Sequence, residues 1–83
     1  MTEPIIQPMS FAELPYYFTV EQHITDNTVK VVIHSKIHVN KEVTMPTSFS
    51  VEVVRTSPNR FRRDVLAFIV RRYGLNLELP KYS

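Results

Sequence analysis

The sequence predicts an α+β domain in which a three-stranded antiparallel meander is covered on one face by a single C-terminal helix. Apolar residues alternate in three successive segments between residues 16 and 54, and residues 58–73 carry an apolar stripe at helical spacing. The chain has 83 residues, of which 43% are hydrophobic and 22% are charged, as is ordinary for one globular domain.

Residues 1–15 contain three of the six prolines in the chain, so we expect them to form an irregular N-terminal arm. Ser10 with Glu13 three residues later is a capping pattern, which is consistent with a short helical turn in this arm. The single α+β domain is then expected to cover residues 16–79, and residues 80–83 to form a C-terminal tail.

The first two predicted strands, residues 16–25 and 28–39, form a hairpin. Asp26 and Asn27 make a suitable two-residue turn between them, because both residue types tolerate positive φ. The resulting register pairs Ile24 with Val29, Val20 with Ile33, and Phe18 with Ser35.

The third predicted strand covers residues 43–54, after a three-residue loop at residues 40–42. The register that follows pairs Val39 with Val43, Ile37 with Met45, Ile33 with Phe49, Val31 with Val51, and Val29 with Val53. Both hairpins then place their apolar side chains on one face, whereas a slip of one residue would turn a strand's apolar set to solvent. Pro46 cannot donate a ladder hydrogen bond, so this strand should lie at an edge or be broken there.

Residues 58–73 predict the clearest element, an α-helix. Ser57 is a suitable N-cap, Pro58 suits the first helical position, and Gly74, the only glycine, follows the last apolar position. The stripe that should cover the sheet consists of Phe61, Val65, Phe68, Ile69 and Tyr73. Alternating leucines at residues 75–79 predict a short fourth strand, which pairs either within the chain or with a second copy in a homo-oligomer.

Charge is unevenly divided between the two parts of the chain. Residues 1–54 carry three lysines against six acidic residues, a net charge of −3, whereas residues 55–83 carry six arginines and one lysine against two acidic residues, a net charge of +5. At 100° per residue, Arg60, Arg63 and Arg71 lie on the side of the helix opposite the core. Such a split favours a charged partner or self-association.

Arg62 falls inside the apolar arc of the helix, where it marks either the rim of an interface or a side chain lying along the sheet edge. Together with Arg60 and Arg63 it places positive charge at the helix N-terminus, which the helix dipole disfavours unless an anion binds there. The alternative for the arginine face is a solvated surface, with Asp64 partly neutralising Arg60.

Tyr17 and Lys36 are expected side by side on the outer sheet face, where the ring can stack on a base or anchor a protein. The predicted partner-binding residues are therefore Arg60, Arg62, Arg63, Arg71, Tyr17 and Lys36.

Several classes of chemistry lack the residues they need. The chain has no cysteine and one glycine, so we expect no thiolate metal site, no cysteine nucleophile and no glycine-rich phosphate loop. His23, His34 and His38 are expected on the solvent side of the sheet, and His34 and His38 are expected too far apart to share a metal. We therefore expect neither an enzyme nor a cofactor.

Two functions fit these features. The first is a protein-binding module (an adaptor, assembly subunit or inhibitor) that presents its arginine-rich helix face to an acidic protein surface. The second is an RNA- or single-strand-binding module that uses the same arginines, although the net charge is only +2. Because no signal peptide and no apolar run of about 18 residues is present, we expect a cytoplasmic protein without a membrane segment.

Overall fold

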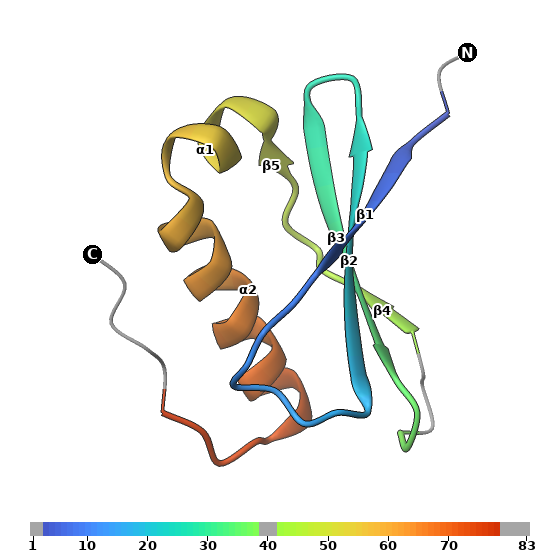
Figure 1. Cartoon of the computed structure of the whole chain (residues 1–83), viewed down its shortest axis with the longest axis vertical. Helices are drawn as coiled ribbons and strands as arrows, with labels where there is room; N and C mark the ends of the chain where they lie inside the picture. The colour runs from blue at the N-terminus through green and yellow to red at the C-terminus, as the bar shows by residue number, and fades with distance from the viewer. Residues whose placement is uncertain (1–2, 39–41, 79–83) are drawn as a thin grey trace.

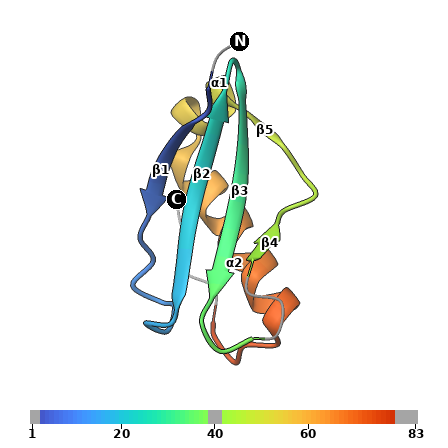
Figure 2. The same ribbon diagram turned by 90° about the vertical axis from the view of Figure 1, so that its right-hand side faces the viewer.

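The chain folds into a sheet and a helical layer, and the computed structural model describes residues 3–38 and 42–78. The elements in chain order are β1 (Ile5–Met9), β2 (Phe18–Thr25), β3 (Thr28–Ser35), β4 (Glu42–Thr44), β5 (Phe49–Ser50), α1 (Val51–Thr56) and α2 (Pro58–Tyr73). The antiparallel sheet has the order β1-β2-β3-β4, and β5 also pairs with β3. Both helices cover the same face of the sheet (Figure 1), and they lie behind the strands when the sheet is viewed face-on (Figure 2). The predicted α+β class, with a C-terminal helix on one face, is confirmed.

The β2–β3 hairpin has the predicted register. Ile24 lies opposite Val29, and the same offset continues along the hairpin to its open end. Asp26 in the turn has a φ of 51°, the left-handed conformation that a tight turn between twisted strands needs.

The N-terminal arm was predicted to be irregular, and this is wrong for residues 5–9, which form the edge strand β1. β1 pairs with β2 and places Met9 opposite Val20 in the core. Pro8 is tolerated because an edge strand has one side without a strand partner. The residues that follow make a single turn, in which the Leu14 N–H donates to the Phe11 carbonyl oxygen (3.3 Å).

The third predicted strand was wrong in its length and its register. It is broken after Thr44, next to Pro46 as expected, and resumes only for the two residues of β5. Ile33 pairs with Val43 and Val29 with Phe49, so the pairing slips by six and four residues from the prediction. Because both slips are even, Val43 and Phe49 keep the face that the prediction gave them.

The chain then turns into a helix where the prediction continued the strand. The Ser50 hydroxyl accepts a hydrogen bond from the Val53 N–H (3.1 Å), and Glu52 lies in the first turn of α1. This N-cap and the favourable charge begin the helix inside the apolar run. Part of the predicted second loop, together with Val39, lies outside the described residues. Glu42, predicted to be in the loop, belongs to β4, and Ile37, predicted on the apolar face, lies beyond the end of β3 and is exposed.

Helix α2 has the predicted bounds. Gly74 ends it in the left-handed conformation with a φ of 64°, and its N–H bonds the Val70 carbonyl oxygen. The Ser57 side chain makes no capping hydrogen bond, because this residue also ends α1, where its N–H donates to the Val53 carbonyl oxygen (2.8 Å). Described residues 75–78 form no strand, so the predicted fourth strand is absent there, and Leu79 lies outside the described residues. Leu75 instead packs against the core.

The core lies between the sheet and the inner side of α2. The helix contributes four buried side chains, and β2 and β3 supply most of the opposing wall. The helical contributors are Phe61, Val65, Leu66 and Ile69. Phe49 and Phe68, predicted to be core residues, are half-buried at its margin.

Candidate functional site

The outer side of α2 carries an arginine face, which we define as Arg60, Arg63 and Arg71. All three are exposed, as the helical spacing predicted. None of them forms an ion pair with any residue in the described part of the chain, and this includes Asp64, which was expected to neutralise Arg60. The arginine face therefore presents unneutralised positive charge on a helix whose opposite side is buried.

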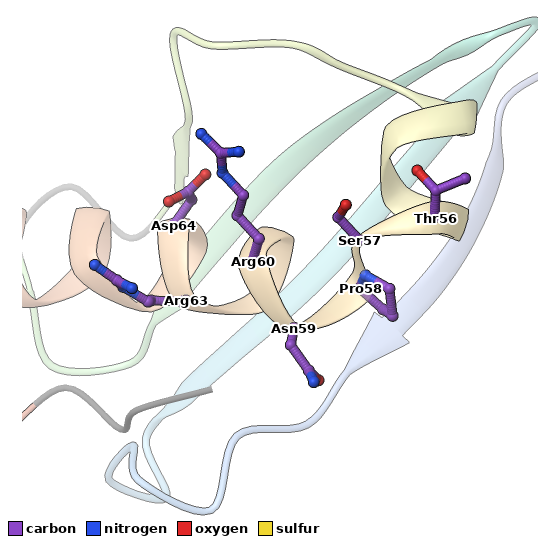
Figure 3. Close-up of a pocket in the computed structure, with 7 residues that line it drawn as sticks. All are labelled: Thr56, Ser57, Pro58, Asn59, Arg60, Arg63 and Asp64. Carbon is purple, nitrogen blue, oxygen red and sulfur yellow. The ribbon is translucent and has the colours of Figure 1, made fainter. Parts of the chain in front are cut away.

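Arg60 and Arg63 line a hollow of about 660 Å³ at the junction of α1 and α2, which we call the junction hollow. Its other lining residues are Thr56, Ser57, Pro58, Asn59 and Asp64. Arg60 and Asp64 point to the same side of α2, whereas Arg63 points along the helix (Figure 3). The first turn of α2 contains no acidic residue, so positive side chains and the positive end of the helix dipole lie together.

A second depression, of about 440 Å³, lies between α2 and the chain that connects β4 to β5. We call it the helix–edge groove. Met45, Thr47 and Phe49 line it from the sheet edge, and Arg63, Asp64, Ala67, Phe68 and Arg71 line it from α2. Arg63 and Arg71 were predicted from the sequence as partner-binding residues, whereas the apolar residues between them were not. The spacing of Arg63, Ala67 and Arg71 by four residues each was visible in the sequence, whereas the wall formed by residues 45–49 was not.

Arg62 differs from its neighbours because the protein itself binds its side chain. Its guanidinium lies 4.5 Å from the centre of the Phe11 ring, and its Nη2 donates to the Ser10 carbonyl oxygen. These contacts attach the segment after β1 to α2. Of the four predicted partner-binding arginines, three form the arginine face, and Arg62 packs against the N-terminal segment.

Tyr17 and Lys36 are neighbours, as predicted, because the Lys36 N–H donates to the Tyr17 carbonyl oxygen (3.1 Å). The predicted place of Tyr17 on the outer sheet face is wrong, because the residue precedes β2 and its ring packs against the core. They line neither the junction hollow nor the helix–edge groove. The Tyr17 ring is half-buried and packs against Phe18, with 4.9 Å between ring centres. It is therefore less available for stacking on a ligand than the prediction assumed, whereas Lys36 is exposed.

His38 was predicted on the solvent side of the sheet, and this is wrong. Because β3 ends at Ser35, the chain bends, and the His38 ring lies 4.5 Å from the ring centre of Tyr73 at the end of α2. Its Nδ1 shares a hydrogen bond with the buried Ser35 hydroxyl. Burial raises the pKa of Tyr73 above its ordinary value of 10.0, and the charge of Arg72 offsets this in part. The Tyr73 hydroxyl has no hydrogen-bond partner among the described residues.

The outer face of the sheet carries a second group of ionisable residues, in which acidic side chains contact histidines. Nε2 of His34 and Nε2 of His23 donate to the same oxygen of Glu21, at 3.0 Å and 3.3 Å. Nδ1 of His34 also lies 3.7 Å from the Glu42 carboxylate. The hydrogen bonds from His34 and His23 lower the pKa of Glu21 below its ordinary value of 4.5. Among residues 3–38 and 42–78, no group of three or more His, Asp or Glu is arranged to hold a metal ion.

The comparisons with known proteins give a family. The chain belongs to the family described as Domain of unknown function (DUF7300), whose model matches residues 5–54. No curated protein and no solved structure matches the chain. The DUF7300 match covers the strands from β1 to β5 and the start of α1. The Glu–His contacts of the sheet therefore lie inside it, and the arginine face follows it in the chain. Neither helix in the described part of this DUF7300 protein is long and apolar enough to cross a membrane.

Proposed function

We propose that this DUF7300 protein is a small non-enzymatic protein-binding module, acting as an adaptor, assembly subunit or inhibitor, which holds an acidic protein surface on its arginine face. The observation that carries the proposal is the state of Arg60, Arg63 and Arg71. All three are exposed on one side of α2 and form no ion pair with a described residue.

The helix supports binding because its backbone is already ordered. Leu66 and Ile69 on its inner side are 0% exposed, so the opposite side keeps a fixed orientation to the sheet. A partner then immobilises arginine side chains but no backbone, which lowers the entropic cost of association. The planar guanidinium binds carboxylates through two parallel hydrogen bonds, and this favours acidic partners.

The alternative is an RNA- or single-strand-binding module, because guanidinium groups bind phosphates with the same geometry. Two features favour the protein-binding proposal over this alternative. The net charge is only +2, and Tyr17, the ring expected to stack on a base, is half-buried against its neighbours. Neither candidate requires a bound cofactor.

The test is a pull-down from native lysate, with and without nuclease, that compares the wild type with the Arg60→Glu/Arg63→Glu double variant. The proposal expects a complex that survives nuclease and moderate salt and is lost in the double variant. Arg72→Glu is the matched control, since Arg72 is exposed on the same helix but lines neither depression. Thermal unfolding should show that both variants remain folded.

Two outcomes would overturn the proposal. Loss of the complex after nuclease treatment, with affinity falling steeply as salt rises, would support the nucleic-acid alternative. A complex that keeps its affinity in the double variant would show that the arginine face is only a solvated surface.

A further inference from the structure

We propose that the helix–edge groove binds an extended acidic peptide with the pattern acidic–x–apolar–x–acidic. This inference rests on the proposed function and names the chemistry of the partner. It uses three features of the groove: two cations at its ends, a small residue between them, and half-buried aromatic side chains along its walls.

The spacing of the two cations determines the spacing of the two acids. Arg63 and Arg71 are eight residues apart, which is about 12 Å along the axis at roughly 1.5 Å per residue. In an extended chain, residues i and i+4 point to the same side and lie about 13 Å apart at roughly 3.3 Å per residue. Two acidic residues with three residues between them therefore reach both guanidinium groups at once.

The middle of the groove accounts for the apolar position. Ala67 lies four residues from each arginine, so its small side chain leaves room at the midpoint. Phe68 from α2 and Phe49 from the sheet edge flank this space, and both are half-buried. An apolar side chain at position i+2 of the peptide points to the same side as the two acids and covers this aromatic surface.

Residues 46–48 and Asp64 bear on which ligand the helix–edge groove binds. Residues 46–48 belong to neither β4 nor β5, and an extended peptide brings its own backbone donors and acceptors alongside them. Among residues 3–38 and 42–78, Asp64 is the one carboxylate that lines the groove, and it follows Arg63 in the chain. It opposes an acidic ligand, so its neutralisation should strengthen binding.

The experiment uses two fluorescein-labelled peptides of identical composition, GSEAFAEGS and GSEEAFAGS, in fluorescence anisotropy titrations with the full chain. The first places its two glutamates on one side of an extended chain, and the second places them on opposite sides. We expect the first to bind up to about fivefold more tightly, because losing one exposed ion pair costs up to about 1 kcal/mol. Equal affinity for the two peptides would overturn the proposal.

Variants of the protein test the two ends and the centre separately. Arg71→Glu should weaken binding of GSEAFAEGS by about fivefold or more, and Asp64→Asn should strengthen it about twofold to fivefold. Ala67→Leu fills the centre without changing charge and should also weaken binding. Arg72→Glu is the control that should leave affinity unchanged. If Ala67→Leu fails to fold, Arg71→Glu and the comparison of the two peptides still test the groove proposal.

The two proposals can fail separately. If Ala67→Leu leaves a nuclease-resistant complex from lysate intact while Arg60→Glu/Arg63→Glu removes it, the groove proposal fails and the protein-binding proposal stands. If neither variant affects that complex, both fail. Preference for a single-stranded oligouridylate over GSEAFAEGS, or tighter binding of a helical peptide with glutamates at positions i and i+8, would also overturn the extended acidic peptide.

Discussion

The outer face of the sheet and the outer face of α2 differ in how their ionisable side chains are partnered. On the outer face of the sheet, Glu21 accepts hydrogen bonds from two histidines, and Glu42 lies near one of them. On the outer face of α2, Arg60, Arg63 and Arg71 form no ion pair with a described residue, even though Asp64 lies on the same side of the helix. On the sheet face, Glu21 already has hydrogen-bond donors within the chain, whereas the three arginines of the helix have no ionic partner among the described residues.

This difference indicates where binding energy is available. A carboxylate that already accepts two hydrogen bonds gains less from a further donor, because its charge is already partly compensated. An exposed guanidinium exchanges only water for a partner carboxylate. Arg62 resembles the sheet face in this respect, because its guanidinium already contacts Ser10 and Phe11 within the chain.

The largest expected effect comes from the core that both surfaces share. Leu66→Ala should lower the free energy of unfolding by about 2–5 kcal/mol, because Leu66 is 0% exposed and its truncation leaves a cavity between helix and sheet. Urea unfolding followed by circular dichroism measures this loss. Leu66→Met, which nearly keeps the volume, should cost less than about 1.5 kcal/mol. Similar small losses in both variants would show that the two layers are less tightly coupled than the burial indicates.

A smaller effect should separate Arg62 from the arginine face. Arg62→Ala should lower the free energy of unfolding by about 1 kcal/mol, because it removes a cation–π contact and a hydrogen bond to the Ser10 carbonyl oxygen. Arg63→Ala, the adjacent exposed arginine, should change stability by less than about 0.5 kcal/mol.

A double-mutant cycle with Phe11→Leu tests whether the stability loss in Arg62→Ala comes from the contact with the ring. If it does, Arg62→Ala should lower the free energy of unfolding by less in the Phe11→Leu background than in the wild type. Equal costs for Arg62→Ala and Arg63→Ala would remove the distinction between the two kinds of arginine.

The smallest expected effect is the pH dependence of the sheet face. Hydrogen bonds from His34 and His23 lower the pKa of Glu21 in the folded protein below 4.5, so Glu21 contributes stability above that pH. The contribution is lost as pH falls through the lowered folded value. Glu21→Gln should therefore show a shallower loss of stability below pH 4.5 than the wild type, measured as urea midpoints along a pH series.

His34→Gln tests whether the histidine contact causes this pH dependence. Removing the main hydrogen-bond donor of Glu21 should also make the loss of stability below pH 4.5 shallower. Glu21 is partly exposed, so we expect a change in slope rather than a large change in stability. Parallel curves for the wild type and Glu21→Gln would show that the histidine contacts do not couple to folding.

The two hairpins show how far prediction from the sequence reaches. The β2–β3 register was correct because a two-residue turn at Asp26 leaves little choice of pairing. The next connection is longer, and its register relied on the alternation of valines up to Val54. The same segment also fits a helix whose N-cap is Ser50, because Val51 and Val54 lie three positions apart and both pack against the core. The strand was therefore extended into α1.

The candidate site divides in the same way. Helical spacing alone placed Arg60, Arg63 and Arg71 on the solvent side of α2, because the apolar stripe decides which side is buried. The same spacing could not tell that Arg62 would meet Phe11, a residue 51 positions earlier in the chain. Nor could it place the chain between β4 and β5 beside α2, which converts a charged helix surface into a groove.

The sequence by itself determined the bounds of α2, the first turn and the face of each apolar residue in β2 and β3. These features depend on residues within a few positions of one another, where caps, turn residues and periodicity act directly. Only the tertiary structure decided that residues 5–9 become an edge strand and that the third strand breaks into β4 and β5. It also decided that Arg62 is bound while Arg63 forms no ion pair with a described residue. These outcomes depend on contacts between segments that are distant in the chain. Such packing contacts can override the conformational preferences of a short segment, so they cannot be predicted from local sequence.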